Sequence, residues 1–407
     1  MSDSPPSAPG SGPDRRTVLG ATAAVLLASV ASSDALATPV ATVDESLPRL
    51  ARGLNLSHWF EYERGQGLNA AEMRQLKALG LDHVRIPVDP VVGGWHPLRG
   101  GKLAFLGELQ AAADMAMAAG LEVVIDLHLE PSDKKILEDQ PATEAELLRL
   151  WQTLAQAFGG SPKRQLALEL FNEPQYYGLK RLRWPPLQRR LLDTVRQRAP
   201  AHLVLLSGSG GGSFEGLASL QPVRDAAVAY VFHHYDPFLF THQGTVWQDE
   251  RYTTAGLRHG LRYPPQPAHD SALPLRAPKA TGIQGAAVKA RAATEMAAHL
   301  QAGWGPQRLR ADMDRAGRFA RERGVRVLCN EFGCIRAQVD ADSRYRWITD
   351  MRTALEANGI GWTLWDYTDI FGITAQSAQL GQVGQRKLDA AAYAALGLQA
   401  SAPGGGR

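Results

Sequence analysis

The chain has 407 residues, of which 44% are hydrophobic and 21% are charged, a composition typical of a globular protein. The formal net charge is only +3 and no block of lysine and arginine stands out, so a nucleic-acid partner is not expected. With two cysteines in the whole chain, a disulfide framework is excluded as the basis of the fold.

The N-terminal segment has the features of an export signal. The twin-arginine pair Arg15-Arg16 precedes an apolar run of 14 residues (18–31), and Ala35-Leu36-Ala37 fits a small-x-small cleavage site. The run is shorter than the ~20 residues that span a bilayer, although an uncleaved anchor is the alternative. We expect residues 1–37 to be a twin-arginine signal peptide, and the mature protein to be periplasmic or secreted without a membrane span.

From residue 50 onward, strand-like apolar runs alternate with amphipathic helical stretches. The eight strand-like runs are 50–59, 83–88, 121–129, 166–172, 202–207, 228–235, 325–332 and 361–366. Helices are predicted over 70–79, 106–119, 143–158, 185–197, 308–323 and 343–358, and Gly80, Gly120, Gly324 and Gly359 follow four of them as left-handed C-terminal caps.

Apolar strands joined by helices predict a parallel sheet, and eight such units fit a (β/α)8 TIM barrel. An open doubly wound sheet is the alternative, but its Gly-x-Gly-x-x-Gly signature is missing after the first run. The glycine-rich stretch at 208–212 is interpreted as a tight turn. We therefore predict one catalytic domain over 38–397 and a disordered tail at 398–407.

The connection after the sixth strand is unusually long, from 237 to 307, with one helix predicted near 286–301. Such a loop is usually functional, and we expect it to cover the cleft and to limit the length of the ligand that enters it. Cys329 and Cys334 flank Glu331, and a disulfide between them would need a sharp turn, so we favour two buried thiols.

Polar and aromatic residues recur where the predicted strands end, which is where a barrel of this kind builds its active site. They are Asn55, His58, Trp59, Arg85, Asp126, His128, Asn172, Glu173, His233, His234, Tyr235, Glu331, Trp365 and Asp366. Glu173 and Glu331 end different strands and could flank one bond. Glycoside hydrolysis needs such a pair, one carboxyl that donates a proton and one carboxylate that attacks or activates water.

Seven segments in order, "RGLNLSHWF", "VRIPV", "VVIDLH", "LELFNEP", "FHHYDP", "CNEFG" and "WTLWDY", resemble glycoside hydrolase family 5, the cellulase family of the retaining clan A. The resemblance covers essentially the whole mature chain. It implies that Glu173 is the acid/base and Glu331 the nucleophile. It also implies that Asn172 binds the sugar 2-hydroxyl, while Arg85 and Tyr235 hold the nucleophile ionised.

The same resemblance makes His128 and His233 substrate contacts and Trp365 the platform under the sugar at the cleavage point. His233 fits the family's His-x-Tyr pattern, although the neighbouring His234 leaves some ambiguity. Asn55, His58 and Trp59 complete the predicted binding and support residues, with Trp59 equally compatible with packing.

Simpler roles remain open for several of these residues. Arg85 and Glu169 could simply form a buried ion pair. Glu169 shares its face with Glu173 and should point into the barrel below the site, so we favour a supporting role for it there. A metal site at the histidines His128, His233, His234 and His242 fits no common spacing, so no metal is expected. The loop tryptophans, whose packing and sugar-stacking roles are equally compatible with the sequence, are Trp95, Trp184 and Trp247.

We therefore expect a cofactor-free, monomeric, retaining glycosidase whose substrate is a polysaccharide or oligosaccharide, with endo-β-1,4-glucanase activity first. A β-1,3-glucanase, a β-mannanase and an exo-acting β-glucosidase are alternatives within the family. The alternative of another class is a non-catalytic glycan-binding barrel that serves exopolysaccharide secretion.

Overall fold

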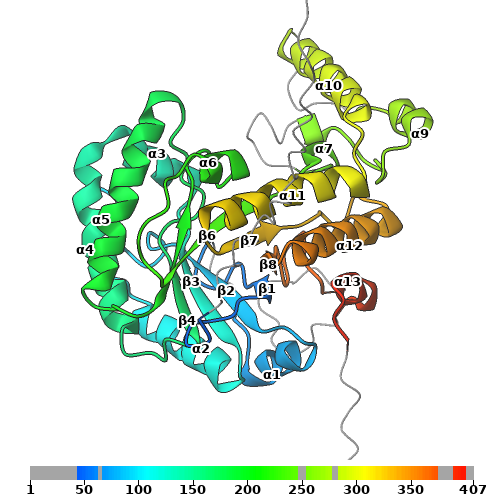
Figure 1. The fold of residues 1–407 in the computed structure, drawn as a ribbon. Helices are drawn as coiled ribbons and strands as arrows, with labels where there is room; N and C mark the ends of the chain where they lie inside the picture. The colour runs from blue at the N-terminus through cyan, green and yellow to red at the C-terminus, as the bar shows by residue number, and fades with distance from the viewer. Residues whose placement is uncertain (1–43, 63–66, 246–253, 277–282, 375–387, 400–407) are drawn as a thin grey trace, which may run out of the picture. The chain divides into compact units, whose positions relative to one another are not determined.

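The computed structural model describes residues 44–62, 67–245, 254–276, 283–374 and 388–399 (Figure 1). Eight parallel strands hydrogen bond in chain order and close into a barrel, which confirms the predicted fold. The strands are β1 (Arg52–Asn55), β2 (His83–Val88), β3 (Glu122–Leu127), β4 (Leu166–Glu169), β5 (Leu203–Ser207), β6 (Val228–His234), β7 (Val327–Phe332) and β8 (Gly361–Leu364).

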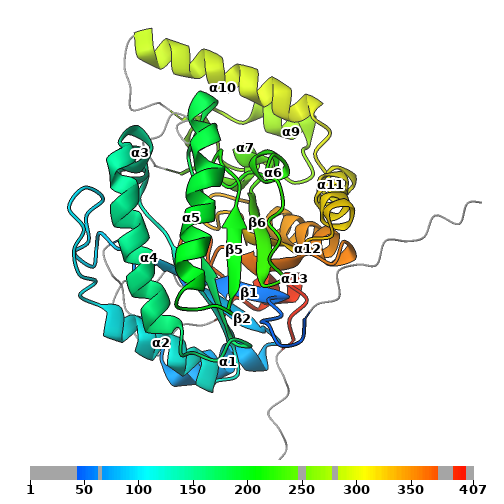
Figure 2. The same ribbon diagram turned by 60° about the vertical axis from the view of Figure 1, so that its left-hand side comes forward.

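Six longer helices follow the predicted stretches to within two residues at each end and surround the barrel (Figures 1 and 2). Helix α1 begins at a capping box, in which Asn69 accepts the N–H of Glu72 and the Glu72 side chain accepts the N–H of Asn69. The six helices are α1 (Ala70–Ala78), α2 (Leu106–Ala118), α4 (Glu144–Phe158), α5 (Trp184–Arg196), α11 (Pro306–Arg323) and α12 (Ala341–Ala357).

Shorter helices in the connections were not predicted, because few residues give too little periodicity to recognise. They are α3 (Pro131–Asp139), α6 (Phe214–Ala218), α7 (Phe238–Thr241), α9 (Pro267–Ala272) and α13 (Ala390–Ala395), with 3-10 turns at Pro141–Thr143 and Gly178–Arg183. The helix predicted near 286–301 is present as α10 (Ile283–Gln301), and both views place α9 and α10 near α7 and away from the strands.

Alternate strand residues face opposite sides of the barrel wall. On β2, Val84 and Ile86 pack outward in the core beneath the helices, whereas Arg85 between them points into the barrel. A separate apolar cluster that includes Val124 and Ala167 fills the lower interior. The inward positions therefore change from apolar to charged toward the C-terminal ends of the strands.

The structure also bears on several smaller predictions. The four capping glycines all have positive φ, as predicted, and both cysteines are buried free thiols. Leu398, which the sequence assigned to a disordered tail, is buried with its N–H on the Tyr393 carbonyl. The predicted signal peptide and residues 400–407 lie outside the described residues. No helix in the described ranges is long and apolar enough to span a membrane.

Candidate active site

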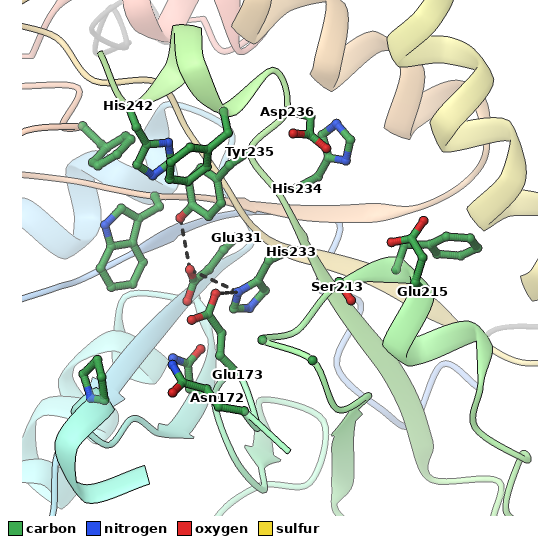
Figure 3. Close-up of a pocket in the computed structure, with 18 of the residues that line it drawn as sticks. Asn172, Glu173, Ser213, Glu215, His233, His234, Tyr235, Asp236, His242 and Glu331 are labelled. Carbon is green, nitrogen blue, oxygen red and sulfur yellow. Dashed lines mark hydrogen bonds and ion pairs between the residues drawn. The ribbon is translucent and has the colours of Figure 1, made fainter. Parts of the chain in front are cut away.

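The C-terminal ends of the strands line one cleft with a volume of about 1380 Å³ (Figure 3). Strand β4 leads to Glu173, β6 carries His233, and β7 carries Glu331. The observed β4 is shorter than the predicted run because the chain leaves the sheet after Glu169. The backbone then bends so that Glu173 adopts φ 45, a left-handed conformation that is strained for a residue with a side chain.

Arg85 is the hub beneath the cleft and is fully buried. Burial by itself would lower the pKa of Arg85, but the carboxylates around it raise the pKa well above its ordinary value, so the guanidinium stays charged. Its N–H donors reach side-chain oxygens of Asn55, Asp126, Glu169, Asn172 and Glu331 at 2.7–3.0 Å. A rigid planar fork with five donors suits this arrangement in a way that a lysine would not.

Glu169 is buried and binds Arg85 through both carboxylate oxygens, at 2.7 and 2.9 Å, and also accepts a hydrogen bond from Asn330 Nδ2 at 2.7 Å. The buried ion pair raised as the simpler interpretation is therefore present, and the support role of Glu169 stays a prediction. Asp126, which was predicted only as a strand-end polar residue, and Asn330, which was not predicted, belong to the same network. The signal available in the sequence was their place near the strand ends. Asp126 on β3 lies two residues before His128, and Asn330 on β7 lies one residue before Glu331.

Hydrogen bonds fix the orientation of the Asn172 amide. Its Oδ1 accepts from Arg85 at 3.0 Å, and its Nδ2 lies 2.9 Å from Nε2 of His128. Nδ1 of His128 lies 2.9 Å from Asp126, so a proton on Nδ1 leaves Nε2 as the acceptor. Burial, followed by the positive charge of Lys134, lowers the pKa of His128 to about 3, which keeps this imidazole neutral. One N–H of Asn172 remains for a bound ligand.

His233 bridges the two predicted catalytic carboxylates (Figure 3). Its Nδ1 lies 2.9 Å from Oε1 of Glu173 and 3.3 Å from Oε2 of Glu331. Burial would raise the pKa of Glu173, but the hydrogen bond and charge of His233 outweigh burial and lower it to about 2. Burial would likewise lower the pKa of His233, but Glu331 and Glu173 raise it. In the free site the shared proton therefore resides on His233.

Glu331 is held from two further directions. Arg85 donates to its Oε1 at 2.8 Å, and the Tyr235 hydroxyl donates to its Oε2 at 3.0 Å. Side-chain atoms of Glu173, His233 and Glu331 lie within 4.8 Å of one another, and these three form the one group in the described residues that could supply three metal ligands. The two carboxylates are thus close enough to act on opposite sides of one bond.

The glycine-rich turn at 208–212 forms part of the site wall, a role that the sequence interpretation missed. Gly210, Gly211 and Gly212 all have positive φ, and the N–H of Gly211 donates to the Pro174 carbonyl beside Glu173. A Cβ on Gly212 would lie only 3.3 Å from Cγ of Glu173 and from the His233 ring. The turn therefore needs glycine to pack directly against the acid and its histidine.

Aromatic residues divide into those at the cleft and those in the core. Trp365 lines the cleft and stacks on His128 with ring centroids 5.6 Å apart. Trp59 is half-buried, packs on Phe60 and does not line the cleft. Of the loop tryptophans raised as stacking surfaces, Trp95 and Trp184 are buried core residues and Trp247 lies outside the described residues.

The structure also shows where the remaining predicted residues lie. His58 lies one step from the cleft, with Nε2 3.5 Å from Asp369, a cleft residue. His233 rather than His234 faces the carboxylates, since His234 turns toward Asp236 (Figure 3). Lys134, a buried lysine that lines the cleft, was not predicted as a site residue. Its position one turn after the β3 exit was the only hint.

The sequence profile named Cellulase (glycosyl hydrolase family 5) matches residues 46–370. The chain belongs to this family. It is therefore a glycoside hydrolase, and the suspected family resemblance is confirmed.

Characterised relatives are similar at low identity. Endoglucanase 3 of Fibrobacter succinogenes is 25% identical over 349 residues, which cover 81% of this chain but 51% of that protein. Endoglucanase C of Acetivibrio thermocellus is 24% identical over 329 residues, which cover 77% of this chain and 90% of that protein. This chain thus spans about half the length of the first relative and most of the second.

Solved structures share the fold. Cel5A of Thermotoga maritima, in a complex with cellobiose, superposes with a TM-score of 0.65 at 20% identity and covers 85% of this chain and 97% of that one. Cellulose synthase subunit Z from Clostridioides difficile superposes with a TM-score of 0.67 at 19% identity, over 85% and 99% of the two chains. At these identities the similarity concerns the barrel.

Proposed function

We propose that this family 5 glycosidase is a retaining endo-β-1,4-glucanase that acts by double displacement. The observation that carries the proposal is the pair Glu173 and Glu331, since one carboxylate oxygen of each lies within 4.8 Å of the other and of a ring nitrogen of His233. Retaining glycosidases separate their carboxyl groups by ~5–5.5 Å, whereas inverting enzymes leave ~6.5–9.5 Å for a water molecule. The endoglucanase names of the two relatives support the β-1,4-glucan.

In the first step, Glu331 attacks the anomeric carbon and the glycosidic oxygen leaves with a proton from Glu173. Arg85 and Tyr235 aim both oxygens of the nucleophile, and Asn172 has an N–H free for the sugar 2-hydroxyl. In the second step, Glu173 takes a proton from water, which attacks the glycosyl ester on Glu331 and gives net retention.

The proton for the leaving group comes from the Glu173–His233 pair. In the free site the lowered pKa of Glu173 and the raised pKa of His233 place the proton on His233, whose Nδ1 lies 2.9 Å from Glu173. As Glu331 forms the ester its negative charge disappears, and with it one of the two charges that raise the pKa of His233. Proton transfer from His233 to Glu173 then becomes easier as the bond breaks.

Product analysis of residues 38–407 on β-1,4-glucan, β-1,3-glucan and β-mannan oligosaccharides tests this function, with E331Q alongside. We expect β-1,4-glucan to be cut, the first product to keep the β configuration in a proton NMR time course, and E331Q to be inactive. Cleavage of another linkage would replace the substrate, inversion would refute the mechanism, and binding without cleavage by the unmodified chain would favour the glycan-binding alternative.

Mode of action, export and assembly remain parts of the proposal. Phe238, His242 and Trp304 bring the long connection to the cleft, which supports a role for it in selecting chain length. A rapid viscosity drop on a long glucan would indicate endo action, and its absence would indicate exo action. We also propose twin-arginine export and a monomer, which cell fractionation of an Arg15→Lys, Arg16→Lys double variant and analytical ultracentrifugation test.

A further inference from the structure

We propose that Lys134 is a specificity-determining residue whose ammonium group donates hydrogen bonds to a hydroxyl oxygen of the glycan chain beside Glu173. This inference rests on the proposed function, because it needs a glycan in the cleft. Lys134 lies in the first turn of α3, which begins directly after the exit of β3. The cleft lining includes Lys134 together with His128, Glu173 and Gln175.

The burial of Lys134 is unusual for its residue type. The residue is 3% exposed, although lysines are almost never fully buried unless they are paired. Nζ of Lys134 makes no hydrogen bond in the described residues, yet it is not fully enclosed. The small exposure that remains therefore includes the ammonium group. The aliphatic stem is therefore packed while the charged end reaches the cleft.

No group in the described residues pairs with this ammonium group at hydrogen-bond or ion-pair distance. Nζ of Lys134 has no hydrogen bond there and no carboxylate within 4.0 Å, whereas the adjacent Lys135 on the same helix lies 2.9 Å from Asp139. An ammonium group has three N–H donors and no acceptor. A buried donor set of this kind is stabilised by oxygen atoms that arrive from the cleft, and sugar hydroxyls are such acceptors.

The surrounding charges favour a neutral hydroxyl over an acidic substituent. Glu130 and Glu173, which interact electrostatically with Lys134, would repel a carboxylate or phosphate on the glycan at this point of the cleft, whereas the arginines Arg308 and Arg315 line the cleft from α11. The charge of Lys134 also acts on the catalytic groups, since it contributes to the lowered pKa values of His128 and Glu173. The role of Lys134 can therefore be measured in two ways, by the affinity for the glycan and by the pKa of His128.

The test compares K134M with K135M, the same substitution at the neighbouring exposed lysine of α3. Tetrasaccharides of β-1,4-glucan, β-1,3-glucan and β-mannan serve as substrates, and calorimetry with E331Q in each background measures binding. A hydrogen bond from a charged donor predicts about a 10- to 100-fold increase in KM and Kd for K134M, with a smaller change in kcat. K134R should recover part of the affinity, and K135M should match the parent chain.

If Lys134 had only a structural role, its replacement would not change the pKa of His128 selectively. We expect the His128 ring pKa, followed by proton NMR in the free protein, to rise from about 3 in K134M and to stay unchanged in K135M. If K134M does not fold, K134Q, which is polar but uncharged, takes its place. The same increase in KM and Kd is then expected.

The outcomes separate the two proposals. If the parent chain cuts a glycan and K134M equals K135M in KM and Kd, the assignment of Lys134 is overturned and the glycosidase stands. If the parent chain binds a glycan without cutting it, the binding comparison alone supports or overturns Lys134. A parent chain that neither cuts nor binds any of the three glycans overturns both proposals.

Discussion

The imidazole of His233 sets the protonation of Glu173, and removing it should raise the pKa of that carboxyl. With His233 in place the pKa is about 2, below the ordinary 4.5, because the hydrogen bond and charge of the histidine outweigh burial. H233A removes both, which leaves burial, the largest effect, opposed only by the smaller effects of Lys134 and His128, so the pKa should rise above 4.5. At 1.36 kcal/mol per pKa unit, the interaction is worth about 3 kcal/mol.

A second variant separates the hydrogen bond from the charge. In H233N the amide nitrogen can occupy the position of Nδ1, 2.9 Å from Glu173, and donate without carrying a charge. The pKa of Glu173 should then lie between those of the parent chain and H233A. At pH 4 Glu173 should be ionised in the parent chain and mostly protonated in H233A.

Carbon NMR of side-chain-labelled glutamate measures this pKa directly, with E173Q identifying the resonance of Glu173. Melting temperatures of both His233 variants serve as the folding control. A pKa that stays near 2 in H233A would refute the reasoning, because some other group would then be stabilising the carboxylate. Equal pKa values in H233A and H233N would show that the charge of His233, and not its hydrogen bond, is decisive.

Three further predictions test the site. G212A should lower kcat at least tenfold through displacement of Glu173, whereas G178A, which shares a positive φ but has nothing within 4 Å, should affect stability alone by about 1 kcal/mol. Y235F removes the 3.0 Å hydrogen bond to Glu331 and should reduce kcat/KM by about 10- to 100-fold at unchanged Tm; an unchanged kcat/KM would exclude this role. Both thiols are buried with raised pKa values, so Ellman's reagent should detect neither at pH 8 before denaturant is added and two afterwards, and native reactivity would contradict their burial.

Periodicity in the sequence was enough to predict the barrel, because its physical cause is local. A buried parallel strand is apolar on both faces, and the helix that follows is amphipathic, so both patterns appear in short windows. The same local patterning located the strand exits, and with them Glu173 and Glu331. Where runs of 50–59 and 166–172 were predicted, the strands end at Asn55 and Glu169, because the later residues leave the sheet to build the cleft.

Long-range packing decided the rest. The sequence by itself determined the barrel, the order of its units and the polar residues at the strand ends. Only the tertiary structure decided which residues meet: that Arg85 joins side chains from five other strands or loops, that Gly212 packs on Glu173, and that Lys134 reaches the cleft with no hydrogen bond from its Nζ within the described part of the chain. These contacts depend on distances between residues far apart in the chain, which no local pattern records.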